Sequence, residues 1–243
     1  MILRAAAASD VGHRRKQNED RYALAPELGL YVVADGMGGH TAGQVASELA
    51  AEASLKAIQT LDGAAATLTE KLRYAVASAN RTIFSTAEQR PEYAGMGTTI
   101  VMMLAEGERA ALAHVGDSRA YRVRAGVIRQ LSDDHSIVGD LLRRNQISED
   151  DAKGHPHRHV LTRALGVRES VEPDLAEISP ALGDVFVLCS DGLTNHVDDH
   201  EIAKMATDIE DLQELCESFV DLANARGGED NTTVIAARCC PST

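Results

Sequence analysis

Three aspartates in this chain stand where an apolar run begins or ends. Asp35 follows the run at 30–34 and precedes the glycine-rich stretch GMGGHTAG, Asp191 follows VFVLCS, and Asp230 precedes NTTVIAA. Strand ends that are far apart in the sequence can meet at one edge of a sheet. Carboxylates that meet there raise one another's pKa and destabilise the fold unless a cation neutralises them. Since these positions carry no Cys or His, the pattern favours Mg²⁺ or Mn²⁺ held by oxygen ligands.

Charged residues near the N-terminus could complete such a site. Glu19 and Asp20 offer further oxygen ligands, and Arg14, Arg15 and Lys16 just before them form the densest basic cluster in an acidic chain. A guanidinium beside metal ions can grip a phosphoryl group through two hydrogen bonds. The alternative is that this cluster is only a solvated turn.

The glycines after Asp35 could instead form a loop that cradles phosphate. The stretch lacks the Lys of a P-loop, and Thr41 breaks the G-x-G-x-x-G spacing that begins at Gly36 and Gly38. Asp-Gly is also a common turn dipeptide, and Asp62-Gly63 is expected to be no more than a turn. The recurrence of acids at strand ends therefore makes Asp35, rather than the glycines, the functional candidate.

The elements that must position these acids are short strands and amphipathic helices. Strand-like runs joined by a few residues cover 97–132, and such short links force antiparallel neighbours. This mixture predicts an α+β fold. Further strands are expected at 3–9, 30–34, 175–179, 184–190 and 232–238, and helices at 41–59, 65–88, 136–144, 200–207 and 211–226.

Composition limits the classes of partner. The chain has 243 residues, 44% of them hydrophobic and 3% aromatic, and this predicts one domain with a largely aliphatic core. The formal net charge of −13 argues against nucleic acid or an anionic membrane as partner. No signal peptide or membrane span is recognisable, and four irregularly spaced cysteines fit reduced thiols in the cytoplasm.

The ordered motifs SDVGHRRKQNED, VVADGMGGHTAG, GTTIV, HVGDSRAYRVRAG, LSDDHS, LTRALG, LCSDGLTNHV and GGEDNTTVI resemble those of the metal-dependent serine/threonine protein phosphatases of type 2C, especially the compact bacterial members. The resemblance runs from about residue 8 to residue 236. It implies a four-layer α-β-β-α sandwich of two antiparallel sheets flanked by helices. The whole of 1–243 would be one catalytic domain, with a surface flap at about 136–160.

The resemblance also implies roles for particular residues. Two ions of Mn²⁺ or Mg²⁺ would be held by Asp35, the Gly36 carbonyl, Asp191, Asp230 and Glu19, with Asp20 in the outer shell. Asp117 would hold a third ion together with Asp191, as in bacterial relatives. Arg15 would contact the phosphate, and a metal-activated water would attack phosphorus in line.

One departure from the family concerns the general acid. Many animal members carry a His directly after the Asp-Gly, whereas this chain has Met37. His40 could protonate the leaving alcohol, or a metal-bound water could do so, and His40 could equally be structural. The run His155-Pro-His157-Arg-His159 lacks further ligands and is expected to be a solvated part of the flap, which in the family lies beside the active site.

The resulting hypothesis is a monomeric cytoplasmic protein phosphatase in bacterial signalling. It would hydrolyse phosphoserine and phosphothreonine on proteins and oppose a serine/threonine kinase. Two alternatives stay open from the sequence: a metal phosphoesterase for nucleotides or small phosphomonoesters, and an inactive module that binds phosphoproteins. The presence of Asp35, Asp191 and Asp230 argues against the inactive module.

Overall fold

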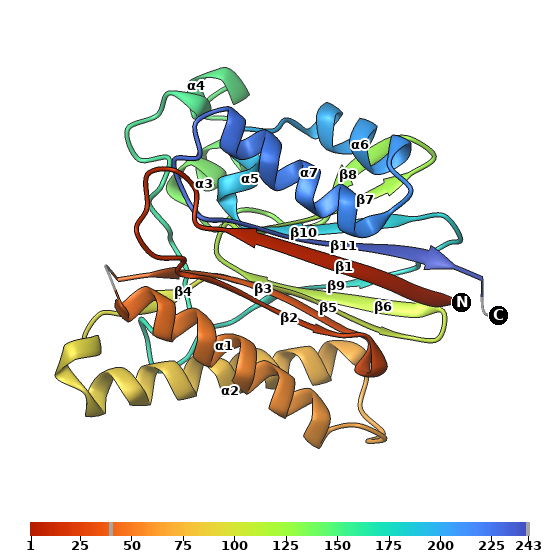
Figure 1. Ribbon diagram of the computed structural model, residues 1–243. Coiled ribbons are helices and arrows are strands. Elements are labelled where there is room, and N and C mark those ends of the chain that lie inside the picture. Colours follow the sequence, from red (N-terminus) through yellow and green to blue (C-terminus); the bar gives the residue numbers. More distant parts are fainter. Residues whose placement is uncertain (39–40, 242–243) are drawn as a thin grey trace.

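Two antiparallel sheets face each other, and helices cover their outer surfaces, as the computed structural model shows for residues 1–38 and 41–241 (Figure 1). The predicted four-layer α-β-β-α sandwich is confirmed. The first sheet has the order β1 (Ile2–Asp10), β11 (Thr232–Cys240), β10 (Val185–Cys189), β7 (Arg119–Arg124) and β8 (Val127–Gln130). The second has the order β2 (Asp20–Ala25), β3 (Leu30–Met37), β5 (Ile100–Glu106), β6 (Arg109–Val115) and β9 (Asp174–Ile178), with β4 (Gly97–Thr98) paired to β3.

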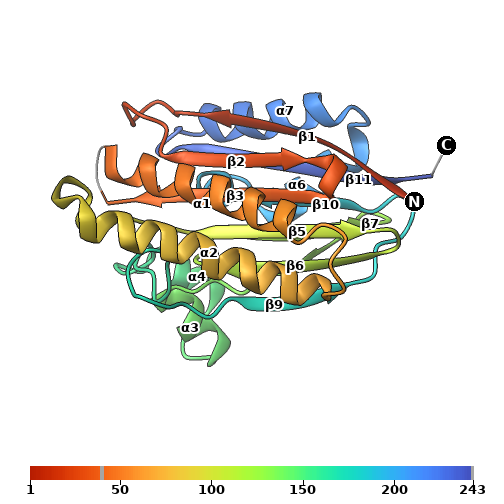
Figure 2. The same cartoon turned by 90° about the horizontal axis from the view of Figure 1, so that it is seen from below.

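Each sheet has its own pair of covering helices. α1 (Thr41–Thr60) and α2 (Leu68–Gln89) pack on the second sheet, and Figure 2 shows both crossing its outer face. α6 (Asp199–Asp208) and α7 (Leu212–Ala225) pack on the first sheet. Shorter helices are α3 (Ile137–Arg143), α4 (Glu149–Lys153) and α5 (Asp191–Thr194), and single 3-10 turns lie at Pro26–Leu28 and Pro91–Tyr93.

The central strands are apolar on both faces because each is covered on both sides. In β3, Tyr31 and Val33 point into the layer between the sheets, whereas Val32 and Ala34 pack under α1 and α2. β10 alternates in the same way, with Phe186 in the layer between the sheets. Uninterrupted apolar runs, rather than alternating ones, are the pattern that such burial requires.

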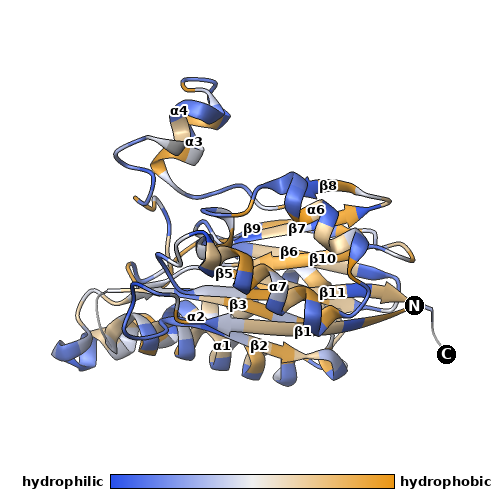
Figure 3. Ribbon diagram, turned by 45° about the horizontal axis from the view of Figure 1, so that its top comes forward, coloured by the Kyte–Doolittle hydropathy of each residue, from blue (hydrophilic) through white to orange (hydrophobic). Residues whose placement is uncertain are grey.

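A segment between β8 and β9 leaves the sandwich and carries α3 and α4. An isolated bridge between Ser136 and Leu161 closes its base, where Ile137 N–H also donates to Val160 O at 2.9 Å. Figure 3 shows α3 and α4 standing away from the sheets, with α4 mostly hydrophilic. This excursion coincides with the surface flap predicted at about 136–160.

Several elements differ from the sequence predictions. The strand expected at 30–34 continues through Asp35 to Met37, because β4 pairs with Gly36 and Met37. β2 and β4 were not predicted as separate strands, and α4 lies in a stretch expected to be irregular, where Ser148 and Asp151 form a reciprocal cap. The expected helix at 65–88 begins at residue 68, since Thr67 caps it by accepting a bond from Glu70 N–H.

The stability of the sandwich depends on the side chains packed between its two sheets, so removing one of them should destabilise the fold. Replacing the fully buried Phe186 by Ala should lower the free energy of unfolding by about 3–5 kcal/mol, because a cavity remains between two rigid sheets. Urea unfolding measures this. The matched control is Phe84→Ala on α2, where the ring is only partly buried. An equal loss in both variants would contradict the central place of this layer.

Candidate metal centre

One cleft gathers almost all the predicted site residues that the structure describes. Its lining includes Arg15, Glu19, Asp35, Gly36, Asp117, Asp191 and Asp230. Asp20 is 1% exposed and is not among the residues that line the cleft. His40, named above as a candidate general acid, lies outside the described residues.

Asp35 is held in the middle of two strand pairings. Its backbone N–H donates to Thr99 Oγ1 at 3.0 Å, and its carbonyl accepts from Thr98 Oγ1 at 2.8 Å and from Thr99 N–H at 2.9 Å. The backbone of Asp35 is therefore fully bonded, and its side chain lines the cleft together with that of Asp191.

Asp20 stands opposite Asp35 in the register of β2 and β3. Its Oδ2 accepts a hydrogen bond from Ser190 Oγ at 2.7 Å, and Ser190 is the residue just before Asp191. Its Oδ1 is buried and has no hydrogen-bond partner among the described residues. A buried carboxylate oxygen without a partner is costly, so a cation or an ordered water is expected beside it.

Asp230 and Asn231, near the C-terminal end of the chain, hydrogen-bond the N-terminal loop at residues 11–19 beside the cleft. Arg15 Nη2 donates to Asp230 Oδ2 at 2.6 Å, with half of the arginine side chain exposed. Asn231 Nδ2 donates to the carbonyls of Val11 at 2.9 Å and Gln17 at 3.0 Å, and Asn231 Oδ1 accepts from Glu19 N–H at 2.8 Å. One amide thus fixes the loop that carries Arg15 and Glu19.

Two glycines act through close packing. A Cβ at Gly36 would lie 2.1 Å from Gly43 O and 2.6 Å from Glu19 O, and a Cβ at Gly43 would lie 2.0 Å from Glu19 Oε2. These positions admit only glycine because β3, α1 and the Glu19 loop meet there. The turn itself falls later, at Gly38, whose φ is +133°. Gly36 and Gly43 thus allow the close packing that brings Asp35 and Glu19 to the same cleft.

Burial and mutual repulsion set the electrostatics of this site. Burial raises the pKa of Asp20 to about 7, and the charges of Asp191 and Asp230 add to the effect. Burial, followed by the charge of Asp191, raises the pKa of Asp117 to about 8. The pKa values of Asp35 and Asp191 are raised for the same two reasons. The described part of the cleft thus holds several carboxyl groups whose negative charges the protein does not neutralise. Such a set of oxygen ligands suits a hard divalent metal ion.

Four residues not predicted from the sequence form hydrogen bonds that position the acids. They are hydroxyls and an amide, namely Thr98, Thr99, Ser190 and Asn231. Each stands beside a predicted acid or in a quoted motif, as in GTTIV, LCSDG and GEDNTT. Their adjacency to the acids was the available signal, since polar residues that interrupt apolar strands need internal partners.

The histidines of the flap divide into two environments. His155 and His157 form a tilted ring pair away from the acids, at 5.7 Å between centroids. His159 is more than half exposed, yet its Nδ1 lies 4.0 Å from Asp191 Oδ2 and its side chain lines the cleft. His157 and His159 are exposed and His155 is partly buried, and His159 lies where the flap meets the cleft.

Similarity to known proteins matches this geometry. A family model described as Protein phosphatase 2C matches residues 12–227. The serine/threonine phosphatase stp of Listeria monocytogenes is 39% identical over 238 residues, covering 96% of this chain and 94% of that protein.

Solved structures agree in fold. The crystal structure of Mycobacterium tuberculosis serine/threonine phosphatase PstP/Ppp superposes with a TM-score of 0.90 and 38% identity, covering 99% of this chain and 100% of that one. A structure of the PstP catalytic domain in complex with two manganese ions gives a TM-score of 0.88 and 37% identity, covering 99% of both chains.

The raised pKa of Asp20 predicts how stability depends on pH when divalent metal is removed. Since the folded pKa of about 7 exceeds the ordinary 3.8, this carboxyl group favours folding below pH 4 and loses that contribution as the pH rises through 7. Asp20→Asn should therefore raise the melting temperature in EDTA at pH 8, and less so at pH 5. Thermal melts of both proteins at both pH values measure this, and a difference independent of pH would contradict it.

The hydrogen bonds of Asn231 predict a second outcome. Asn231→Ala leaves two carbonyls and one N–H without their partner, at a cost of about 2–4 kcal/mol, so the loop at 11–19 should open more often. Trypsin should then cleave at Arg14 to Lys16 at least about tenfold faster. Asn195→Ala, which removes one bond to Asp191 and none to this loop, is the control. Equal cleavage rates in the two variants would exclude this role.

Proposed function

The chain belongs to the protein phosphatase 2C family, and we propose that it hydrolyses phosphoserine and phosphothreonine on proteins at the cleft that holds Asp35, Asp191 and Asp230. The observation that carries the proposal is the convergence of Asp35 and Asp191, from distant parts of the chain, on one cleft that also holds Asp117, Asp230 and Glu19. Acids crowded in this way have no structural benefit without a cation.

Two ions of Mn²⁺ or Mg²⁺ fit the donor set. Asp35 would bridge them, the Gly36 carbonyl, Asp191 and Asp230 would complete one shell, and Glu19 would hold the second ion. Asp117 would share a third ion with Asp191. When bound, such ions acidify a water for attack on phosphorus. PstP in complex with two manganese ions supports the choice of metal.

Asp20 and Arg15 act around these ligands in the proposal. Asp20 would stay in the outer shell, where Ser190 holds one of its oxygens. Arg15 would bind the phosphate oxygens: Asp230 occupies only one of its donors, and its exposed guanidinium lines the cleft. A fork of donors beside neutralised carboxylates stabilises the charge that develops on the equatorial oxygens.

The leaving alcohol must take a proton from a group other than Met37, whose thioether carries none. We propose His40 as this general acid, with water at the metal site as the alternative. His40→Ala should then raise the requirement for a good leaving group, so that activity on an aryl phosphate falls less than activity on a phosphopeptide.

The substrates are phosphoproteins, and the shape of the cleft supports this choice over small phosphomonoesters. Flap residues such as Arg158 and His159 line the same cleft as the acids, so a substrate bound at the acids can also contact the flap. We further propose a monomeric catalytic domain spanning 1–243, a cytoplasmic location consistent with free Cys189, Cys216, Cys239 and Cys240, and a partner serine/threonine kinase. Among the described helices, none is both long and apolar enough to cross a bilayer.

The central experiment removes single charges from the acid cluster. Asp35→Asn and Asp191→Asn should each lower hydrolysis of a phosphothreonine peptide in Mn²⁺ by more than about 100-fold, because each removes a ligand charge while the fold gains from reduced repulsion. Asp221→Asn, on the exposed side of α7, is the matched control. Retained turnover in either site variant, or turnover unaffected by chelator, would overturn the proposal.

A further inference from the structure

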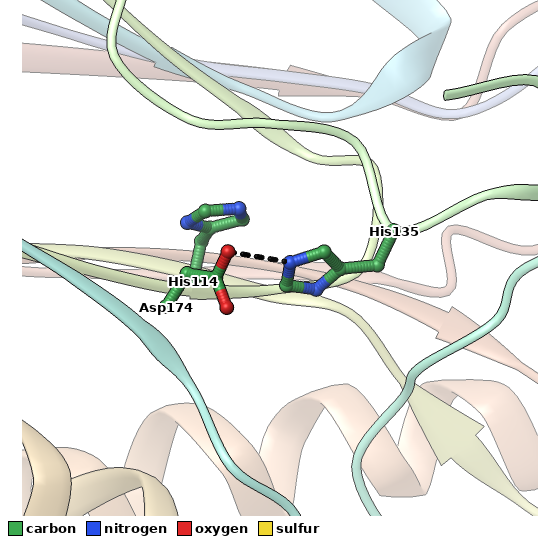
Figure 4. A group of neighbouring side chains, drawn as sticks. All are labelled: His114, His135 and Asp174. Carbon is green, nitrogen blue, oxygen red and sulfur yellow. Dashed lines mark ion pairs between the residues drawn. The ribbon is translucent and has the colours of Figure 1, made fainter. Parts of the chain in front are cut away.

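Two histidines and an aspartate form a compact group beside the metal centre but outside the predicted ligand set. His114 and His135 are buried and stack at 4.6 Å between ring centroids, and His135 Nε2 lies 3.3 Å from Asp174 Oδ2 (Figure 4). Arg163 Nη1 holds the other oxygen of Asp174 at 2.6 Å. Neither histidine was singled out from the sequence, although each sits inside a quoted motif, HVGDSRA and LSDDHS.

The protonation of both rings follows from their partners. His135 Nδ1 accepts a bond from Gly116 N–H at 3.2 Å, so in the neutral ring the proton is on Nε2, facing Asp174. His114 Nε2 lies 2.8 Å from the carbonyl of Asp133, which can only accept, so this nitrogen also carries a proton. Burial lowers the pKa of His135 to about 4, helped by His114 and Arg163, so its ring stays neutral at physiological pH.

This tautomer argues against a metal site at the group itself. Coordination through His135 Nε2 would need that proton removed while Nδ1 still accepts from Gly116, which leaves an imidazolate. The three ligand atoms lie within 4.8 Å of one another, and a tetrahedral zinc with bonds of about 2.0–2.1 Å would draw them closer, to about 3.4 Å. The hydrogen bonds of His135 instead connect it to Gly116.

Gly116 is bonded to His135 through both of its backbone groups. His135 N–H donates to Gly116 O at 2.9 Å, in addition to the bond between Gly116 N–H and the ring. Gly116 has φ of +108°, and a Cβ there would lie 2.6 Å from Thr99. This conformation is open to glycine but rarely to L side chains, and the two bonds to His135 fix it here.

The residue after Gly116 is Asp117, and the residue after that is fixed as well. Ser118 Oγ lies 2.7 Å from Thr99 Oγ1, the same hydroxyl that accepts from Asp35 N–H. Asp117 thus lies between a glycine held by His135 and a serine held by Thr99, the residue that also bonds the Asp35 peptide.

We propose that His135 is a positioning residue for Asp117: its Nδ1 fixes the peptide of Gly116, which directs the Asp117 carboxylate toward Asp191. The inference rests on the proposed role of Asp117 as a ligand of the third ion. It assigns a task to a buried imidazole that the proposed reaction does not use.

The test exploits the different reach of two amides. In His135→Asn the side-chain oxygen occupies the place of Nδ1 and keeps the bond from Gly116 N–H, whereas in His135→Gln the amide reaches only to the place of Nε2. Calorimetric titration with Mn²⁺ should show the weakest ion bound about tenfold less tightly in His135→Gln and nearly as in the parent in His135→Asn. Hydrogen exchange of the Gly116 amide, measured by NMR, should be accelerated only in His135→Gln.

A double-mutant cycle separates positioning from a general loss of stability. Asp117→Asn and His135→Gln should each weaken the same ion, and the double variant should be no weaker than Asp117→Asn alone, because His135 acts through Asp117. Additive effects would overturn the inference, as would equal behaviour of the Asn and Gln variants. A Zn²⁺ site that is lost in Asp174→Asn would also overturn it, by assigning the group to a metal.

Both readouts are independent of hydrolysis, so the two proposals fail separately. If the parent protein hydrolyses no phosphopeptide, the proposed function fails while the titration still reports on His135. If it does and His135→Gln titrates like the parent, only the role of His135 fails. Should His135→Gln not fold, His135→Asn decides alone, and a loss as large as that of Asp117→Asn would overturn the inference.

Discussion

Repulsion between carboxylates is the constraint on which the rest of this structure depends. Asp35 and Asp191 line one cleft, and with Asp20, Asp117 and Asp230 they are close enough to raise one another's pKa values. A chain with a net charge of −13 has no excess of cations to offset them. Among the arginines and lysines of the described residues, only Arg15 forms an ion pair with one of these acids. The fold must therefore hold its acids against one another until a cation shares the cleft.

The means of holding them is backbone and hydroxyl bonding rather than charge. Thr98 and Thr99 fix the peptide of Asp35, Ser190 holds Asp20, and Asn231 fixes the loop of Glu19. Neutral donors and acceptors of this kind set position without neutralising the carboxylates, which keeps their charge available for metal. The same logic extends to His135, a neutral ring that bonds the peptide next to Asp117.

The sequence predicted the layers and the acids better than their supports. Long apolar runs and helical periodicity located the central strands and α1, α2 and α7, because burial on two faces leaves an unmistakable pattern. β2 was not predicted from the sequence, because its six residues, DRYALA, combine charged and small side chains. They form a strand only by pairing with β3. α4 was not predicted either, because a helix of five residues is too short to show a helical pattern of hydrophobic residues.

Within the site, acids were predictable because their recurrence at strand ends has few explanations. The group of His114, His135 and Asp174 was not, because its members lie on separate segments and meet only through the pairing of β6 with β9 and the turn after β8. The resemblance of eight ordered motifs supplied ligand roles that spacing alone could not. His40 remains a prediction, since it lies outside the described residues.

The apolar strands have a further consequence for how the sheet pairs correctly. A strand that is hydrophobic on both faces can slip by one residue and still bury only hydrophobic side chains, so its apolar pattern does not specify one alignment. In β3 the alignment is specified at its polar end, where Thr98 and Thr99 bond the Asp35 peptide. The residues that prepare the cleft for metal are thus also the ones that discriminate the native alignment from its shifted neighbours. Selection for catalysis and selection for unique folding act on the same few side chains.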